Sequence, residues 1–541
     1  MDPDALFSAR DQLWFYLAAP VLALAALVLT VRLRAPQWRL LGKAFRGLRL
    51  RGGKDEAHPV APGLATALAS VGAFGAAAAV GSATAVSLGG AGVLPWLWLF
   101  GILLAPIRYG ETLLAGTDAP GRGEKAASGS LPRRLLRMGD RWRVPGWLFL
   151  ALTLFAGFTW AGGVQGLALR DAAAEILPGS TLPLAAGVAG VGALLVLGGA
   201  RFHAVAGWIG AAGLLALTVA ALWGFAADPG AAFGTLGRAF GDAFEGAPQL
   251  EDFTGAFAGE IAFAAVLHVL APMGATAGVA GAINGLSTGK TRPQAAVSVL
   301  GPLFHAAVAT LLVMAFVGTG AFGTRVASER GLDGVRVYRI AAETASQRAE
   351  GDRLYSGQMR IMEGQARNPT LSLGTDRGMV REPRFERRGE PADVALVVED
   401  GRAIRIMAPG RFGALAEIDR SALDEITVQG EMLPTGAGLL VGSLEQGGGD
   451  LAGRFALAAI LALAAVALAA WGFALGRSLP ASAPLPAQIG AGLLPAAGAL
   501  LAATGAAPWL TPLGGIAAAL LATATGLLLL ARTRELHELG K

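Results

Sequence analysis

Long apolar stretches alternate with shorter polar segments along most of this 541-residue chain. A helix needs about 20 mostly apolar residues to cross the hydrocarbon core of a bilayer. The pattern therefore predicts an all-α polytopic membrane protein with eleven transmembrane helices. These helices are expected near residues 13–31, 61–88, 92–115, 146–167, 183–200, 204–226, 254–278, 295–318, 453–475, 488–506 and 510–531.

One region, residues 324–449, breaks the apolar pattern: it is polar and uses arginine without any lysine. The segments 395–398 and 403–406 flank Asp400-Gly401, which predicts a β-hairpin with a tight turn. This region is expected to be a small, soluble, β-rich domain. The predicted organisation is helices one to eight in 1–323, the inserted domain in 324–449, and helices nine to eleven in 450–541.

Three further local predictions concern this inserted domain. Residues 425–428 resemble another strand, and residues 341–350 are expected to form a short helix. The segment 377–388 is dense in charges of both signs and is interpreted as a flexible loop.

Composition limits the class of protein. Hydrophobic residues make up 54% of the chain and charged residues only 15%, too few for a charged aqueous surface on all sides. The chain contains no cysteine, which excludes disulfides and cysteine metal sites. The sequence lacks a P-loop, a nucleophile elbow, a cluster with metal-ligand spacing and a dinucleotide fingerprint, so we expect neither an enzyme nor catalytic residues.

The basic residues predict the orientation in the membrane. Cytoplasmic loops of membrane proteins are enriched in lysine and arginine. The loops after the first and third predicted helices are both strongly basic, whereas the acidic loop around 228–252 falls on the opposite side. This pattern places the N-terminus and the 324–449 domain outside and the C-terminus in the cytoplasm. The composition is typical of a GC-rich bacterial genome and of the cell (inner) membrane. The positive charge thus marks one membrane face, and no nucleic-acid partner is expected.

Two of the predicted helices are interrupted by helix-breaking residues. The second carries Gly72, Gly75 and Gly81, and the seventh, five helices later, carries a second cluster made of Pro272, Gly274, Gly278 and Gly281. Two five-helix repeats that each begin with a broken helix have inverted topology, which is typical of secondary transporters. The alternative is that these small residues only allow helices to pack closely.

Several short motifs resemble the alanine/glycine:cation symporter family, whose members have the leucine-transporter fold. The segment 30–34, Thr-Val-Arg-Leu-Arg, is similar to the family's motif after its first helix. The segment 75–111 is similar to the family's broken second helix and the block that follows it, through Gly89-Gly90, Trp96, Trp98 and Arg108-Tyr109-x-Glu111. Val164-Gln165, Met273-Gly274 and Gln294 to Gly301 continue the resemblance, which covers all eleven helices and leaves the inserted domain outside.

The resemblance implies cation-coupled uptake of a small amino acid such as alanine or glycine. The coupling ion is the only cofactor that it implies. Sodium and a proton both remain open, because this chain has Ala76-Ala77-Ala78 and Val269-Leu270 where the family has polar residues, and His305 where it has a carboxylate. A hard cation needs several oxygen ligands, and the ninth predicted helix offers no serine or threonine between 455 and 475.

The candidate substrate site uses backbone groups and one side chain. A carboxylate is expected on the N–H groups that the break around Gly75, Ala76 and Ala78 sets free, and an ammonium on carbonyl groups of the second broken helix. Gln165 would close this site, unless it only satisfies neighbouring helix carbonyls. The residues expected from the second broken helix are Pro272, Met273 and Gly274.

Four ionisable residues are candidates for coupling or gating. His305 and His268 lie in predicted helices, and histidine titrates near neutral pH, so either is able to carry a proton. Arg108 and Glu111 lie three residues apart on one helix and are candidate gating residues. An ion pair, or side chains that snorkel to the membrane surface, would explain Arg108 and Glu111 without a function.

The sequence also allows a second function. In this alternative the chain is a transporter-like membrane protein that no longer transports. Its external domain would then bind or sense a partner that the sequence does not name. Apart from that domain, the expected partners are a small amino acid and the lipid bilayer.

Overall fold

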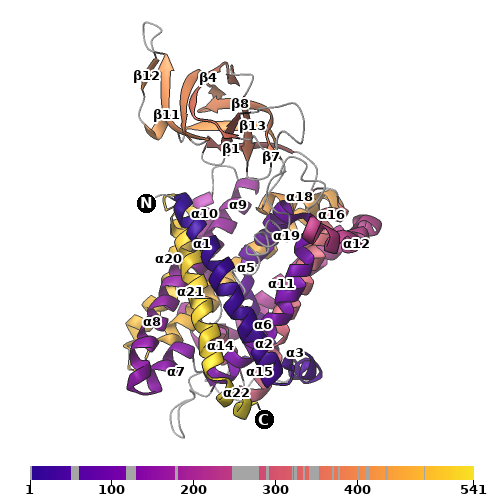
Figure 1. Ribbon diagram of the computed structural model, residues 1–541, viewed down its shortest axis with the longest axis vertical. Coiled ribbons are helices and arrows are strands. Elements are labelled where there is room, and N and C mark those ends of the chain that lie inside the picture. Colours follow the sequence, from indigo (N-terminus) through magenta and orange to yellow (C-terminus); the bar gives the residue numbers. More distant parts are fainter. Residues whose placement is uncertain are drawn as a thin grey trace.

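The structure is a computed structural model of the whole chain. It describes residues 3–49, 60–116, 130–176, 181–245, 279–287, 291–319, 321, 326–332, 335–339, 353–367, 371–375, 378–399, 401–409, 415–417, 420–423, 425–432, 436–480, 482–507 and 509–540. Figure 1 shows a bundle of long helices with a group of strands at one end. The N-terminus lies at the end of the bundle next to the strands, and the C-terminus lies at the opposite end.

The helical part begins with a long helix that includes a short π-helical segment, and most of its other elements are also long helices. In chain order the described elements of the first part are α1 (Pro3–Leu13), η1 (Trp14–Ala18), α2 (Ala19–Arg32), α3 (Pro36–Arg39), α4 (Leu41–Gly47), α5 (Pro62–Gly89), η2 (Gly90–Gly92), α6 (Val93–Gly116), α7 (Leu131–Arg137), α8 (Asp140–Ala156), η3 (Gly157–Gly162), α9 (Gly163–Ile176), α10 (Thr181–Leu197), α11 (Ala200–Ala227), α12 (Pro229–Glu245), α14 (Val279–Asn284), α15 (Thr291–Ser298) and α16 (Leu300–Gly318). The helices after the strands are α18 (Gly436–Gly448), α19 (Asp450–Ser478), α20 (Leu485–Ala503), α21 (Leu510–Ala531) and α22 (Thr533–Leu539).

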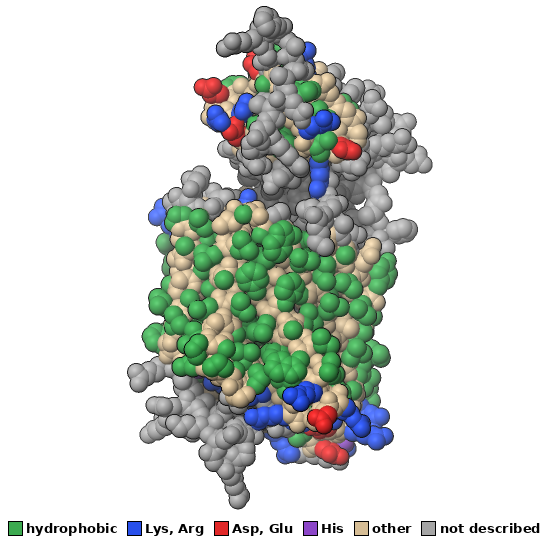
Figure 2. All heavy atoms as spheres, turned by 90° about the vertical axis from the view of Figure 1, so that its left-hand side faces the viewer, with side chains coloured by type: hydrophobic (Ala, Val, Ile, Leu, Met, Phe, Trp, Pro, Cys, Tyr) green, Lys and Arg blue, Asp and Glu red, His purple; other side chains and the backbone are tan. Residues whose placement is uncertain are grey.

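Among the described residues, eight helices are long and apolar enough to cross a membrane. The number is nine if the two halves of the bent helix α5 count as one span, and a shorter apolar helix covers Leu182–Leu197. The predicted seventh helix, 254–278, lies outside the described residues. Figure 2 shows the broad apolar band of the bundle and the lysine and arginine side chains gathered along its lower edge. The chain is therefore a multi-pass membrane protein.

Two helical elements differ from the prediction. The fourth predicted helix, 146–167, is longer in the structure, because α8, η3 and α9 continue from one into the next over 140–176. The loop expected around 228–252 contains helix α12, which has an amphipathic pattern and exposes Phe233 and Phe240. A helix with one apolar face does not produce the continuous apolar stretch by which membrane spans are recognised.

The strands form three antiparallel sheets. Their orders are β1-β13-β8-β9, β12-β11-β10-β4-β5 and β3-β2-β6-β7. The strands are β1 (Val326–Gly331), β2 (Arg336–Arg339), β3 (Arg353–Leu354), β4 (Gly357–Met362), β5 (Gln365–Ala366), β6 (Leu371–Thr375), β7 (Gly378–Met379), β8 (Arg381–Arg387), β9 (Glu390–Pro391), β10 (Val394–Glu399), β11 (Arg402–Pro409), β12 (Leu415–Glu417) and β13 (Ile426–Met432), with a 3-10 turn η6 (Arg420–Leu423). Together these sheets enclose their own apolar core.

The predicted hairpin is confirmed, since β10 pairs with β11 and Leu396 lies opposite Ile406. The predicted strand at 425–428 is confirmed as the start of β13. The short helix expected at 341–350 lies outside the described residues.

The interpretation of 377–388 as a flexible loop was wrong, because β7 and β8 lie in this segment. The apolar ring of Phe385 is fully buried, and Arg387 and Arg388 both bind the carboxylate of Glu425 next to strand β13. The hydrogen bond from Arg388 holds the pKa of Glu425 below its ordinary value, with Arg387 adding to the effect. The dense charge of this segment indicated a loop, but opposite charges on neighbouring strands of a sheet pair with one another.

Helix α18 belongs to the helical bundle, although its residues fall inside the range 324–449. It packs against α5, α11 and α19 and buries Leu439, Leu440 and Leu444. Among the described residues, the strands end at Met432, before this helix begins. The domain limits drawn from the sequence stay a prediction, and α18 returns the chain from the sheets to the bundle.

Helices α5 and α19 pack against each other at the centre of the bundle. Helices α11 and α16 also contact α5, and α20 contacts α19 on its other side. Most residues of α19 between 463 and 475 are buried, and many of them are alanine. Small side chains let two helix backbones approach closely in a membrane. This close contact positions the candidate site.

Candidate functional site

Helix α5 is broken near its middle. Gly75 has φ +50° and ψ −155°, which is not helical, and the two halves of the helix meet at an angle of 67°. In an unbroken helix the N–H of Ala76 would donate a hydrogen bond to the C=O of Gly72, four residues earlier. The break separates these two groups. Both then need other hydrogen-bond partners, because no water is available to bond them within the bilayer core.

Two buried side chains supply those partners. The side-chain oxygen Oε1 of Gln165, on α9, accepts hydrogen bonds from the N–H of Ala76 at 3.0 Å and the N–H of Ala77 at 3.3 Å. The indole N–H of Trp471, on α19, donates a hydrogen bond to the C=O of Gly72 at 2.8 Å. The side chains of α9 and α19 thus cap the two ends that the break creates.

The break depends on the absence of side chains at Gly72 and Gly75. A Cβ atom at Gly75 would lie 2.4 Å from Nε2 of Gln165 and 2.7 Å from the Cβ of Ala467. A Cβ atom at Gly72 would lie 2.9 Å from the Cβ of Ala470. The positive φ at Gly75 also disfavours any residue with a side chain.

Replacement of Trp471 by phenylalanine tests the cap on the Gly72 carbonyl. The ring stays, but the N–H is lost and a buried C=O has no donor, which costs about 1–3 kcal/mol. We expect W471F to lower the thermal unfolding midpoint of the detergent-purified protein. Trp208 is 66% exposed on the surface of the bundle, so W208F is the control and should leave the midpoint unchanged. Equal midpoints for W471F and the wild type would contradict the role of this hydrogen bond.

The structure brings several predicted site residues together and leaves others untested. Gly75, Ala76 and Gln165 meet at the break. Ala78 lies one turn further along the same half of α5. Four candidates lie outside the described residues: Pro272, Met273, Gly274 and His268. Trp471 was not predicted, because it stands in an alanine-rich helix and nothing local marks its partner.

A cavity of about 310 Å³ opens beside the break, between α5, α11 and α16. Its lining is mostly apolar and includes Gly75 and the polar side chains of Ser82, Thr218 and His305. His305 is only 8% exposed. The volume lies at the small end of the range for ligand pockets. The candidate coupling residue His305 therefore shares a cavity with the helix break.

Arg108 and Glu111 form a buried ion pair on α6. The guanidinium of Arg108 lies 3.1 Å from the carboxylate of Glu111, and their side chains are 6% and 0% exposed. The other carboxylate oxygen of Glu111 accepts a hydrogen bond of 2.8 Å from the N–H of Gly281 on α14. The suggestion that these side chains snorkel to the membrane surface was wrong, because both are buried. The predicted ion pair is confirmed, and the gating role of these residues stays a prediction.

A network of uncharged polar groups lies around this ion pair. Gln294, on α15, donates hydrogen bonds to Asn284 at 3.0 Å and to Thr66 at 3.2 Å. Ser298 accepts a hydrogen bond from Thr112 and donates one to the C=O of Arg108. The space left between these helices is only about 10 Å³. In this conformation α5, α6, α14 and α15 are closed against one another here.

Within the described residues, no group of three or more histidine, cysteine, aspartate or glutamate side chains is arranged to hold a metal ion. As far as the structure describes it, the candidate site combines backbone amides and two capping side chains with a buried ion pair on α6.

Comparison with known proteins identifies the family of this chain. The family model described as the sodium:alanine symporter family matches residues 4–348, more than half of the chain. The chain belongs to the sodium:alanine symporter family. Its family is thus one of transporters rather than enzymes. The match ends within the polar region, so the predicted resemblance over the last three helices is not covered by it.

A curated relative that matches a shorter stretch is described as a transporter. An "Uncharacterized transporter" from Haemophilus influenzae (strain ATCC 51907 / DSM 11121 / KW20 / Rd) is 39% identical to this chain over 120 residues. The match covers 21% of this chain and 25% of the relative. This similarity thus concerns about a quarter of the relative's length.

Proposed function

We propose that this symporter-family protein takes up a small amino acid, such as alanine or glycine, driven by a cation gradient. The observation that carries the proposal is the break at Gly75, where the helical hydrogen bond from the N–H of Ala76 to the C=O of Gly72 is lost. The N–H groups of Ala76 and Ala77 instead donate to the side-chain oxygen of Gln165, beside a cavity. A substrate carboxylate would replace Gln165 on these N–H groups, because helix N-termini favour negative charge.

The second half of the proposed site comes from the seventh helix. Its carbonyl groups around Pro272, Met273 and Gly274 would accept the substrate ammonium. This arrangement requires eleven transmembrane helices in two inverted repeats of five after the first. The five-helix spacing between the two glycine-containing interruptions in the sequence supports it.

The Arg108–Glu111 pair is proposed as part of a gate. It joins α6 to α14 through the N–H of Gly281, and α14 follows directly after the proposed second broken helix. A movement of that segment on substrate binding would therefore act on the pair. We further propose an inner-membrane location with the N-terminus and the sheets outside. The basic residues at the end of the bundle that holds the C-terminus support this orientation.

The coupling ion is proposed to be sodium or a proton. Family membership favours sodium, and the position of His305 at the cavity favours a proton. Uptake of labelled alanine and glycine into vesicles separates them when a sodium gradient and a pH gradient are applied in turn. If the proton is coupled through His305, H305Q should abolish acceleration by the pH gradient. An unchanged response of H305Q would exclude this role of His305.

The same uptake experiment distinguishes the second candidate function, a transporter-like protein that no longer transports. The mostly apolar lining of the cavity favours this alternative, as does the triple alanine at 76–78. Uptake that stays flat under every gradient, with folded protein in the vesicles, would support it. Uptake that follows one gradient would exclude it.

A further inference from the structure

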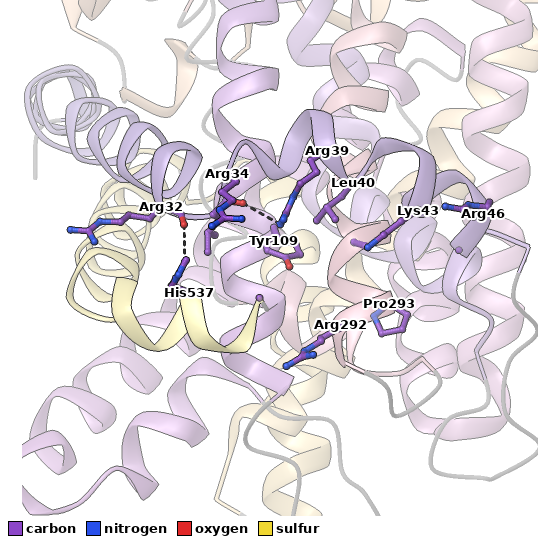
Figure 3. A pocket seen from close by; sticks show the side chains of 14 residues that line it. Arg32, Arg34, Arg39, Leu40, Lys43, Arg46, Tyr109, Arg292, Pro293 and His537 are labelled. Carbon is purple, nitrogen blue, oxygen red and sulfur yellow. Dashed lines mark hydrogen bonds between the residues drawn. The ribbon is translucent and has the colours of Figure 1, made fainter.

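A basic pocket of about 700 Å³ lies at the end of the bundle that holds the C-terminus. It is formed by the end of α2, the short helices α3 and α4, and parts of α6, α15 and α22. Figure 3 shows its side chains, with Tyr109 between Arg39 and Arg292 in this view. Six cationic residues line the pocket: Arg32, Arg34, Arg39, Lys43, Arg46 and Arg292.

The charged side chains in the described lining of this pocket are all positive. Within the part of the chain that the structure describes, no aspartate or glutamate lines the pocket, and none of its six cations lies within 4.0 Å of a carboxylate. Like charges that are held together repel one another. An anion in the pocket would relieve this repulsion.

The backbone that presents the arginines is held in an unusual conformation. Arg34 and Ala35 both have positive φ, +58° and +49°, although neither is glycine. Such conformations are strained and persist only where their surroundings enforce them. Here the N–H of Ala35 donates a hydrogen bond to the C=O of Thr30, and Gln37 donates one to the hydroxyl of Thr30. The turn thus directs the chain from α2 into α3 beside the pocket.

Two further hydrogen bonds hold the pocket wall. The guanidinium of Arg39 donates a hydrogen bond of 3.3 Å to the C=O of Leu33. The Nδ1 atom of His537, on α22, lies 2.9 Å from the C=O of Arg32. These contacts connect α22 to the end of α2 and fix one side of the pocket. The cations are therefore presented from a built wall rather than from a loose segment.

The pocket lies where lipid headgroups are expected. Trp38 and Phe45, on the same short helices as Arg39, Lys43 and Arg46, are 56% and 53% exposed. Exposed aromatic rings beside basic residues are typical of helices that lie in the membrane interface. Figure 2 shows lysine and arginine side chains along the edge of the apolar band at this end of the bundle. Arginine forks match phosphate oxygens, and basic pockets on the cytoplasmic side bind phosphorylated headgroups.

We propose that this pocket binds a phosphate group, carried by the headgroup of an anionic phospholipid or by a soluble phosphate. This site is separate from the helix break, and it does not depend on which amino acid is transported. Arg39 and Arg292 would hold the phosphate from two sides, across the pocket from each other.

Two experimental arms test the proposal with the full chain in neutral detergent. In the first, cardiolipin, phosphatidylglycerol or neutral phosphatidylcholine is added at equal concentration, and native mass spectrometry counts the bound lipid. In the second, inorganic phosphate is added without lipid, and the thermal unfolding midpoint is measured. The test variant is R39Q/R292Q, and the charge-matched control is R141Q/R143Q, which removes two exposed arginines of α8 outside the pocket.

We expect the wild type to retain more of the anionic lipids than of phosphatidylcholine. The amount of anionic lipid bound to R39Q/R292Q should be at least about tenfold lower than that bound to the wild type. The control should behave like the wild type. A phosphate-dependent rise of the midpoint that R39Q/R292Q loses, without selective lipid retention, assigns the site to a soluble phosphate. If R39Q/R292Q does not fold, K43Q/R46Q replaces it.

Two outcomes would overturn the proposal. The first is a wild type that responds to neither the anionic lipids nor phosphate. The second is a control variant that loses as much binding as the pocket variant, because the effect would then come from surface charge in general.

Discussion

Replacement of Gly75 by alanine should reduce alanine uptake by about tenfold or more while the protein remains folded. The added Cβ would lie 2.4 Å from Nε2 of Gln165, and the alanine would have to adopt the positive φ of +50°. Either α5 straightens at residue 75 or Gln165 leaves the N–H groups of Ala76 and Ala77. Both changes remove the preformed anion site, whose charge-assisted hydrogen bonds are worth about 1.5–3 kcal/mol each.

Gly190→Ala is the matched control for this variant. Gly190 lies in α10, and a Cβ there would have no neighbouring atom within 4 Å. We expect G190A to transport like the wild type. Uptake and protein amount are measured in the same proteoliposomes. A G75A protein with wild-type uptake would show that the break at Gly75 is not needed for transport.

Replacement of Glu111 by glutamine should strongly destabilise the protein. The carboxylate of Glu111 is fully buried and binds both the guanidinium of Arg108 and the N–H of Gly281. Removal of one partner from a buried ion pair leaves an uncompensated charge and costs about 3–5 kcal/mol. We expect a large decrease in the unfolding midpoint of the detergent-purified protein, and a loss of uptake with it.

Two companion variants separate this effect from a general loss of charge. The double variant R108Q/E111Q removes both charges and should recover part of the lost stability, since no charge is left buried alone. Asp11→Asn removes one partner of an exposed pair with Arg10 and should change the midpoint little. If E111Q melts like the wild type, the pair does not hold α6 to α14.

Features that depend on local residue chemistry were predictable from the sequence. The break in α5 follows from Gly75, because only glycine takes a positive φ without strain. The hairpin of β10 and β11 follows from two short segments, 395–398 and 403–406, that flank Asp400-Gly401. Gln165 was found through the family resemblance, and its partners are the N–H groups expected to be free.

Features that depend on contacts distant in sequence were not predictable. Trp471 lies 399 residues from Gly72, and no pattern within α19 indicates that its indole N–H reaches a carbonyl of α5. The burial of Arg108 and Glu111 requires α14 and α15 to pack over α6. Strand β8 was interpreted as a loop because its segment is dense in charge. Arg387 in this strand pairs with Glu425, which lies 38 positions later in the sequence. A single sequence contains no signal for these pairings.

We propose that backbone N–H groups at the break in α5 hold the carboxylate of the substrate. The most direct test of this role measures how well unlabelled alanine and alaninamide inhibit uptake of labelled alanine into proteoliposomes. Alaninamide keeps the ammonium and the side chain but lacks the carboxylate. We expect alaninamide to inhibit uptake at least about tenfold more weakly than alanine, because it cannot make the charge-assisted hydrogen bonds. Equal inhibition by the two compounds would contradict it.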